Sequence, residues 1–175
     1  MRHHRNCSSG VNEIMTTTII EERRCLLLDA AATVSAGARI AAGICGGVVI
    51  ALSGELGAGK TTLVRGMLKG LGWSGSVKSP SYALVEQYFV SSLYFYHFDF
   101  YRFRDPDEWR YTGFAEHFRP DSICVIEWPE RVVPWLPEID LDVHLEYADP
   151  GRVLTLRAAT AAGRACLENF SAEAK

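Results

Sequence analysis

Paired-cysteine signals are missing from this chain. Its cysteines are odd in number and no two of them form a C-x-x-C pair; they are Cys7, Cys25, Cys45, Cys124 and Cys166. The five histidines also lack the short spacings of a metal-binding motif. These absences argue against a disulfide framework or a zinc site. They favour a reducing compartment, which we take to be the cytoplasm.

Long apolar segments are also missing. No apolar run approaches the roughly 18 residues that a membrane-spanning helix requires, so we expect no membrane partner. Residues 1–15 carry basic side chains without the apolar centre of a secretory signal. We expect this stretch to be a disordered extension, with Met15 as a possible true start. A mitochondrial presequence is the alternative, and the acidic Glu13, Glu21 and Glu22 argue against it.

An excess of positive charge is the third absence. The formal net charge is −3, and 48% of the 175 residues are apolar while 22% are charged. A protein that binds nucleic acid by itself needs a clustered basic surface to neutralise phosphates. The composition therefore argues against direct nucleic-acid binding, although it leaves room for a role beside nucleic acid within a complex. The length suits one domain with a sizeable core.

What is present is a succession of segments with the patterns of strands and helices. Residues 16–28 are predicted to form a first strand, and Asp29 to cap a helix over 30–44. The continuous apolar runs 48–52 and 123–126 are typical of strands buried on both faces of a parallel sheet. Alternation predicts two hairpins, formed by residues 82–101 and 141–156, and Asp105 begins a further helix. We expect one domain over 16–157, followed by a weakly ordered tail over 158–175.

A glycine-rich loop follows the run 48–52. Residues 54–61 match G-x-x-x-x-G-K-T, the Walker A motif, and apolar residues at helical spacing follow it. Glycines let successive backbone N–H groups point at a phosphate, and the start of the helix adds a positive end. Lys60 supplies a mobile positive charge and Thr61 a hydroxyl suited to Mg²⁺. The predicted nucleotide-binding residues are Gly57, Ala58, Gly59, Lys60, Thr61 and Thr62.

Two carboxylates are predicted to complete the site, because each lies at the carboxyl end of a strand. Glu127 closes the buried run 123–126, as the acid of a Walker B strand does. Asp99 follows a tyrosine-rich strand, and pattern alone favours neither a functional acid nor a solvated strand end. Glu127 is the predicted second Mg²⁺ ligand beside Thr61, and the catalytic candidates are Asp99, Glu127 and Lys60.

The absence of a guanine-recognition segment predicts which base the nucleotide carries. Guanine-specific loop proteins use N-K-x-D, and none of Asn6, Asn12 and Asn169 begins such a segment. ATP is therefore favoured over GTP. Together these patterns predict an α/β P-loop three-layer fold, with a mostly parallel central sheet and added antiparallel hairpins.

The aromatic residues concentrated between Tyr82 and Tyr111 allow two interpretations. They could form a stacking platform for bases. Packing in the core and in the hairpin is the interpretation that we favour, because the aromatics alternate along the chain and few lysines lie near them.

Four blocks in the order GELGAGKTTLVRGMLKGLG, VKSPSYALVEQY, YHFDFYR and ICVIEWPER resemble the TsaE family, also called YjeE. The resemblance covers roughly residues 25–157. It implies a small ATPase that supports N6-threonylcarbamoyl transfer to adenosine 37 of tRNAs reading codons that begin with A. It also implies a TsaB–TsaD complex as the protein partner, which carries the transfer chemistry and through which tRNA is met indirectly.

The resemblance also assigns residues. Glu127 matches the family's magnesium-linked acid, and Asp99 matches an acid implicated in hydrolysis. Thr33 and Arg152 lie where the family lines the adenosine side of the nucleotide. The segment 79–82 resembles a switch-like loop that usually reads SPTY; Ser81 keeps the hydroxyl and loses the stiffening methyl group.

Three alternatives stay open on the sequence. Arg102 could supply a positive charge during hydrolysis or form an ion pair with Asp99. The chain could instead be a small kinase, although no arginine-rich lid segment is evident. It could also be an assembly factor gated by nucleotide without essential hydrolysis.

Overall fold

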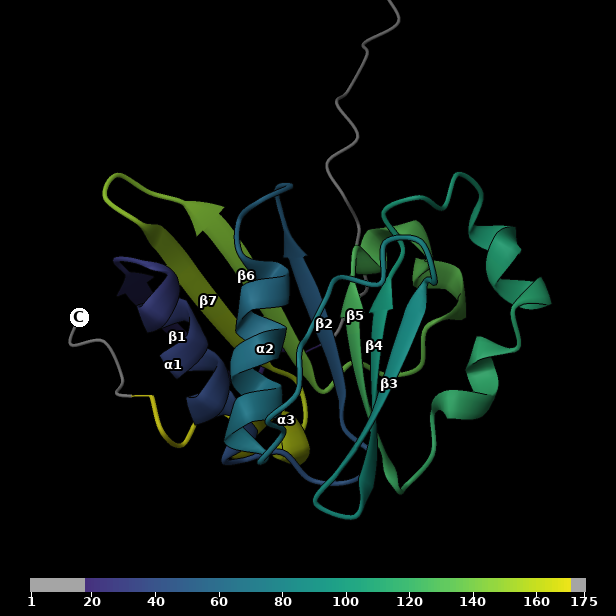
Figure 1. Cartoon of the computed structure of the whole chain (residues 1–175), viewed down its shortest axis with the longest axis horizontal. Coiled ribbons are helices and arrows are strands. Elements are labelled where there is room, and N and C mark those ends of the chain that lie inside the picture. Colours follow the sequence, from purple (N-terminus) through teal and green to yellow (C-terminus); the bar gives the residue numbers. More distant parts are fainter. Residues whose placement is uncertain (1–17, 171–175) are drawn as a thin grey trace, which may run out of the picture.

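The structure is a computed structural model, and it describes residues 18–170 (Figure 1). The expected extension over 1–15 lies outside the described residues. One sheet runs through the molecule in the order β1-β7-β6-β2-β5-β4-β3. Its strands are β1 Glu21–Leu27, β2 Val49–Gly54, β3 Val85–Val90, β4 Leu93–Asp99, β5 Ser122–Glu127, β6 Leu141–Tyr147 and β7 Arg152–Ala158.

The sheet is parallel in its middle and antiparallel at its edges. Strands β6, β2, β5 and β4 are parallel neighbours, and every residue of β5 is buried, as its apolar run predicts. The pairs β1–β7, β7–β6 and β3–β4 are antiparallel. The prediction of a mostly parallel sheet is therefore correct only for the four central strands. Strand β1 pairs antiparallel with β7, the second strand of the hairpin β6–β7. This pairing joins distant parts of the chain, so no local pattern predicts it.

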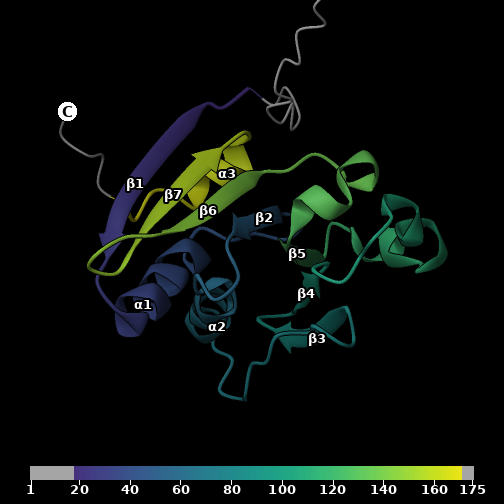
Figure 2. The ribbon, with the colours of Figure 1, turned by 90° about the horizontal axis from the view of Figure 1, so that it is seen from above.

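Two helices cover one face of this sheet (Figure 2). Helix α1 spans Ala30–Ala41, and Asp29 caps it by accepting a hydrogen bond from the backbone N–H of Ala32 at 2.7 Å, as predicted. Helix α2 spans Lys60–Gly70 and begins directly after the glycine-rich loop. The two helices pack closely because glycines lie where they cross: a Cβ atom on Gly66 would lie 2.2 Å from the carbonyl oxygen of Val34.

Replacing Gly66 with alanine is expected to destabilise the fold. The added methyl group overlaps backbone atoms of α1, an overpacking cost of about 3 kcal/mol, and the better helix propensity of alanine returns only about 1 kcal/mol. We expect the free energy of unfolding, measured in urea, to fall by about 2 kcal/mol. Ser35→Ala on the exposed face of α1 is the control and should change it little. An unchanged Gly66→Ala protein would contradict this packing.

The opposite face carries an aromatic core under four short 3-10 helices. These are η1 Pro106–Tyr111, η2 Phe114–His117, η3 Pro129–Arg131 and η4 Val133–Trp135. Asp105 caps η1 through a complete capping box, so the predicted helix start is confirmed in 3-10 form. The buried aromatics here are Tyr96, Phe98, Phe100, Phe103, Trp109 and Phe114. Packing therefore accounts for most of the aromatic segment, whereas Tyr82 and Tyr111 are exposed.

The end of the chain is more regular than the expected weakly ordered tail, as far as residue 170. Thr160 caps a short helix, α3 Ala161–Ala165. Cys166, Leu167 and Phe170 are buried in the core on the side of α1 and α2. The segment is rich in alanine and shows little contrast between polar and apolar faces, which explains why its packing was missed. None of the helices within 18–170 is long and apolar enough to cross a membrane.

Candidate nucleotide-binding site

The loop between β2 and α2 has a backbone that only glycine adopts readily. Gly54, Gly57 and Gly59 have φ angles of 127°, 82° and 109°, in the left-handed region. At Gly54 a Cβ atom would also lie 2.2 Å from the carbonyl oxygen of Leu145 on β6. The strand, the loop and the helix follow one another as the motif requires, so the predicted context of the loop is confirmed.

Lys60 folds back along this loop. Its Nζ donates to the carbonyl oxygens of Gly54 at 2.7 Å and Glu55 at 2.9 Å. It also lies 4.1 Å from the centre of the Trp128 ring. Burial lowers the pKa of Lys60, and the carboxylates of Glu127 and Asp99 act in the opposite direction. The side chain therefore places a cationic donor inside the loop, between the glycines and the two acids.

The predicted acids meet the loop at the end of the parallel sheet. Asp99 and Glu127 are opposite each other in the register of β4 and β5, and both are buried. Thr61 Oγ1 donates to Glu127 Oε1 at 2.9 Å. The structure thus brings together the Thr61 hydroxyl and the Glu127 carboxylate, which lie 66 positions apart in the sequence.

Asp99 accepts hydrogen bonds from the segment 79–82 and from the backbone that follows β4. Ser79 Oγ donates to Asp99 Oδ2 at 2.8 Å, and the backbone N–H of Tyr101 donates to Oδ1 at 3.0 Å.

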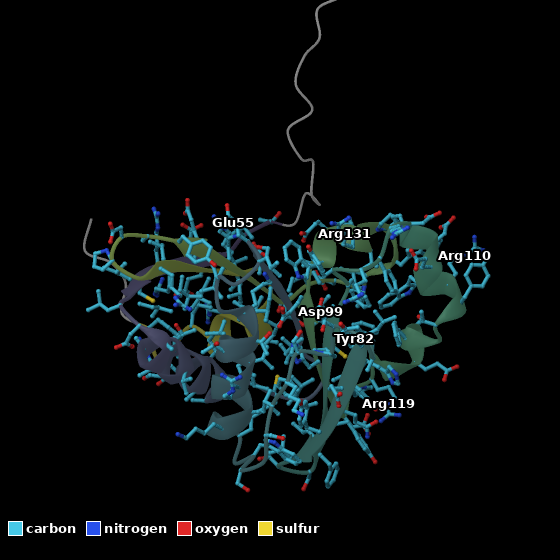
Figure 3. All side chains as sticks on the ribbon, turned by 45° about the horizontal axis from the view of Figure 1, so that its top comes forward. Glu55, Tyr82, Asp99, Arg110, Arg119 and Arg131 are labelled. Atoms are coloured by element: carbon cyan, nitrogen blue, oxygen red, sulfur yellow. The ribbon has the colours of Figure 1, made fainter. Side chains whose placement is uncertain are left out.

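Arg102 lies with its guanidinium 4.3 Å from the centre of the Tyr82 ring. Among the described ion pairs none joins Arg102 to Asp99, so that alternative is not observed. Asp99 lies toward the middle of the molecule, whereas Glu55, Arg110 and Arg131 lie along its rim (Figure 3).

Thr33 and Arg152 both reach the loop, from opposite ends of the chain. Arg152 Nη1 donates to the carbonyl oxygen of Ala58 at 3.1 Å, and its Nε is buried without a partner among the described residues. Thr33 is fully buried, and its hydroxyl donates to the carbonyl of Asp29, the residue that caps α1. Both side chains lie beside Gly59. Their contact with an adenosine stays a prediction.

Three residues of the site were not predicted: His97, Trp128 and Tyr147. His97 Nε2 lies 2.9 Å from Glu127 Oε1, and the Tyr147 hydroxyl donates to the carbonyl of Leu56 at 3.0 Å. His97 and Asp99 lie two residues apart on β4 and therefore on the same face of the strand. This alternation could have indicated that His97 belongs to the site. Nothing in the local sequence indicates Tyr147, because its contact depends on β6 lying beside β2.

Most of this chain is similar in sequence to one family of known proteins. A sequence model of the family described as "Threonylcarbamoyl adenosine biosynthesis protein TsaE" matches residues 27–167. The chain belongs to the TsaE family. The range that matches the TsaE model contains every predicted site residue, from Thr33 to Arg152.

Individual TsaE relatives agree with this assignment. The Haemophilus influenzae tRNA threonylcarbamoyladenosine biosynthesis protein TsaE is 48% identical over 124 residues, which cover 71% of this chain and 78% of that protein. The Bacillus subtilis protein of the same name is 36% identical and covers 64% of this chain and 70% of its own length. A crystal structure of Bacillus subtilis YdiB superimposes with a TM-score of 0.73 at 26% identity, covering 86% of this chain and 95% of that one. The resemblance drawn from the sequence blocks is confirmed.

Proposed function

We propose that this TsaE-family chain binds ATP and Mg²⁺ at the loop 54–61 and hydrolyses the ATP in support of tRNA threonylcarbamoyladenosine formation. The observation that carries the proposal is the meeting of Lys60, Thr61 and Glu127, with Thr61 Oγ1 at 2.9 Å from Glu127 Oε1. The modified nucleotide would be adenosine 37 of tRNAs that read codons beginning with A. The setting would be the cytoplasm.

The residues present fit magnesium and a triphosphate. Mg²⁺ prefers oxygen ligands and keeps several positions for water and phosphate. The Thr61 hydroxyl and the Glu127 carboxylate supply two such oxygens. Among residues 18–170 no group of three or more His, Cys, Asp and Glu side chains forms a separate metal cage. Thr61 and Glu127 would hold the magnesium, and bound magnesium would neutralise phosphate charge there.

Each side chain has a distinct task in this proposal. Lys60 Nζ donates to two loop carbonyls, and it can exchange these acceptors for phosphate oxygens without leaving the loop. Glu127 Oε1 accepts hydrogen bonds, while Oε2 receives none within the described part of the chain. Asp99 accepts on both oxygens. Either acid could orient the attacking water, and the contact pattern leaves Glu127 with the freer oxygen.

The partner in this proposal is a TsaB–TsaD complex, which would carry the transfer chemistry and hold the tRNA. The names of the relatives, which assign them to tRNA threonylcarbamoyladenosine biosynthesis, support the relation to tRNA. The net charge of −3 favours an indirect one. Hydrolysis by the chain alone is expected to be slow, since the single candidate arginine beside Asp99 is occupied with Tyr82.

Reconstituted modification tests this function and separates its rivals. TsaB–TsaD, tRNA and this chain are combined with ATP, and threonylcarbamoyl-tRNA is counted over many turnovers. We expect the chain to sustain repeated turnover with ATP and to fail with a non-hydrolysable analogue. Equal support by the analogue would identify a nucleotide-gated assembly factor. Transfer of the γ-phosphate to a nucleoside or sugar, without effect on modification, would identify a small kinase.

A further inference from the structure

His97 is a buried residue that contacts Glu127 and has no task in the function proposed above. It is a residue of β4, its relative exposure is 0%, and its Nε2 is 2.9 Å from Glu127 Oε1. In the register of β4 and β5, His97 is opposite Val125, so Glu127 is its diagonal neighbour two residues further along β5. Asp99 is opposite Glu127 itself. The three side chains therefore form one polar row beneath the start of α2.

The contacts of Glu127 indicate which nitrogen of His97 donates. Thr61 Oγ1 donates to Glu127 Oε1, and the same oxygen is the one that His97 Nε2 approaches. A carboxylate oxygen that already accepts from Thr61 is an acceptor, so a hydrogen on Nε2 is the arrangement in which this contact is a hydrogen bond. The other ring nitrogen, Nδ1, is buried and has no partner among the described residues.

An unpartnered Nδ1 argues against a packing role for His97. A buried polar atom without a hydrogen bond destabilises a fold, and a leucine or phenylalanine in the same place avoids that cost. The imidazole offers the fold only one contact that an apolar side chain could not supply, namely the bond from Nε2 to Glu127. The use of a histidine here is therefore explained by Glu127.

We propose that His97 is a positioning residue for the metal site: its Nε2–H holds Glu127 Oε1, and thereby fixes the carboxylate for Mg²⁺. This inference rests on the proposed binding of Mg²⁺ and ATP. Ligands of metal ions are commonly oriented by such hydrogen bonds from a second layer of residues. Thr61 alone cannot do this, because its hydroxyl is itself a predicted metal ligand. His97 touches neither phosphate nor metal in this role and acts only through Glu127.

Three substitutions of His97 separate positioning from packing. Glutamine places its side-chain N–H₂ four bonds from Cα, as far along the chain as histidine Nε2, so His97→Gln can still donate to Glu127. Asparagine places its N–H₂ one bond short, and leucine has no donor, so His97→Asn and His97→Leu cannot. Phe95→Leu is the matched control, because Phe95 is fully buried two residues earlier on the same strand. Removing part of that ring disturbs the core without touching Glu127.

The readout is metal affinity rather than turnover. Mn²⁺ replaces Mg²⁺, and its binding to each ATP complex is followed by electron paramagnetic resonance, with ATP affinity measured separately in EDTA. We expect His97→Asn and His97→Leu to weaken Mn²⁺ binding by about 10- to 100-fold and to leave metal-free ATP affinity unchanged. His97→Gln should restore most of the loss, and Phe95→Leu should bind Mn²⁺ like the wild type. Wild-type Mn²⁺ affinity in His97→Asn, or an equal loss in His97→Gln and Phe95→Leu, would overturn the inference.

A measurement on the nucleotide-free protein tests the contact independently. Long-range ¹H–¹⁵N spectra of the imidazole should show the hydrogen of His97 on Nε2, and Glu127→Ala should shift that signal. A hydrogen on Nδ1 alone would overturn the inference even where ATP binds as proposed. A wild-type protein that shows the Nε2 hydrogen and yet binds no Mn²⁺ with ATP would instead overturn the proposed function.

Discussion

Lys60→Ala is expected to lose tight ATP binding. The ammonium group of Lys60 lies inside the loop, where it donates to the carbonyls of Gly54 and Glu55. A charged hydrogen bond to phosphate contributes up to about 3 kcal/mol, so its loss should weaken ATP binding by roughly 100-fold. Titration calorimetry with ATP and Mg²⁺ measures the effect.

The matched control for this prediction lies on the same helix. Lys69 is an exposed residue in the last turn of α2. Lys69→Ala removes an equal charge without touching the loop, so ATP affinity should stay near that of the wild type. Lys60→Ala should also unfold in urea at a similar midpoint, which separates lost binding from lost structure. Unchanged ATP affinity in Lys60→Ala would contradict the assignment of the loop.

Glu127→Gln is expected to separate binding from hydrolysis. The amide oxygen of glutamine can still accept from Thr61 and His97, so the local structure should persist while the negative charge is removed. In the proposed function the loop and Lys60 hold the phosphates, so ATP should still bind. Hydrolysis should fall by roughly 100-fold, in line with the loss of a preorganised electrostatic group from an active site.

A neighbouring acid supplies the control for Glu127. Glu130 is exposed and also acts on the charge of Lys60. Glu130→Gln changes the local charge by the same amount without removing a ligand oxygen. Its hydrolysis rate, followed by phosphate release at saturating ATP and Mg²⁺, should stay close to that of the wild type. Equal losses in both variants would show that charge near Lys60, rather than Glu127 itself, supports the reaction.

The parts of the fold that the sequence predicts are those with local signals. The run before the loop, the glycines and the helix after it define β2, the loop and α2 without reference to the rest of the chain. The continuous apolar run 123–126 indicates a central strand in the same way. The antiparallel placement of β1 against β7 was not predictable, because edge pairing depends on contacts between the two ends of the chain. The packing of Phe170 against the helix-side core depends on the same kind of contact.

In the site, too, the residues with local signals are predictable and the contacts between distant residues are not. Lys60 and Thr61 follow from the motif, and Glu127 follows from its place at the end of a buried strand. The spacing of residues in the sequence does not predict which carboxylate oxygen accepts from each donor, and the structure shows it. The bond from Thr61 to Glu127 and the bond from His97 to the same oxygen arise only when β4, β5 and α2 are assembled.

In the proposed function the loop 54–61 binds ATP, and its hydrolysis supports a partner complex. The most direct test is the rate of ATP hydrolysis by the purified chain, measured alone and then with TsaB–TsaD and tRNA. We expect slow hydrolysis by the chain alone, a clear increase with the partners, and no increase when Lys60→Ala replaces the wild type. A hydrolysis rate that the partners leave unchanged, together with multiple-turnover modification that proceeds equally well without the chain, would contradict this function.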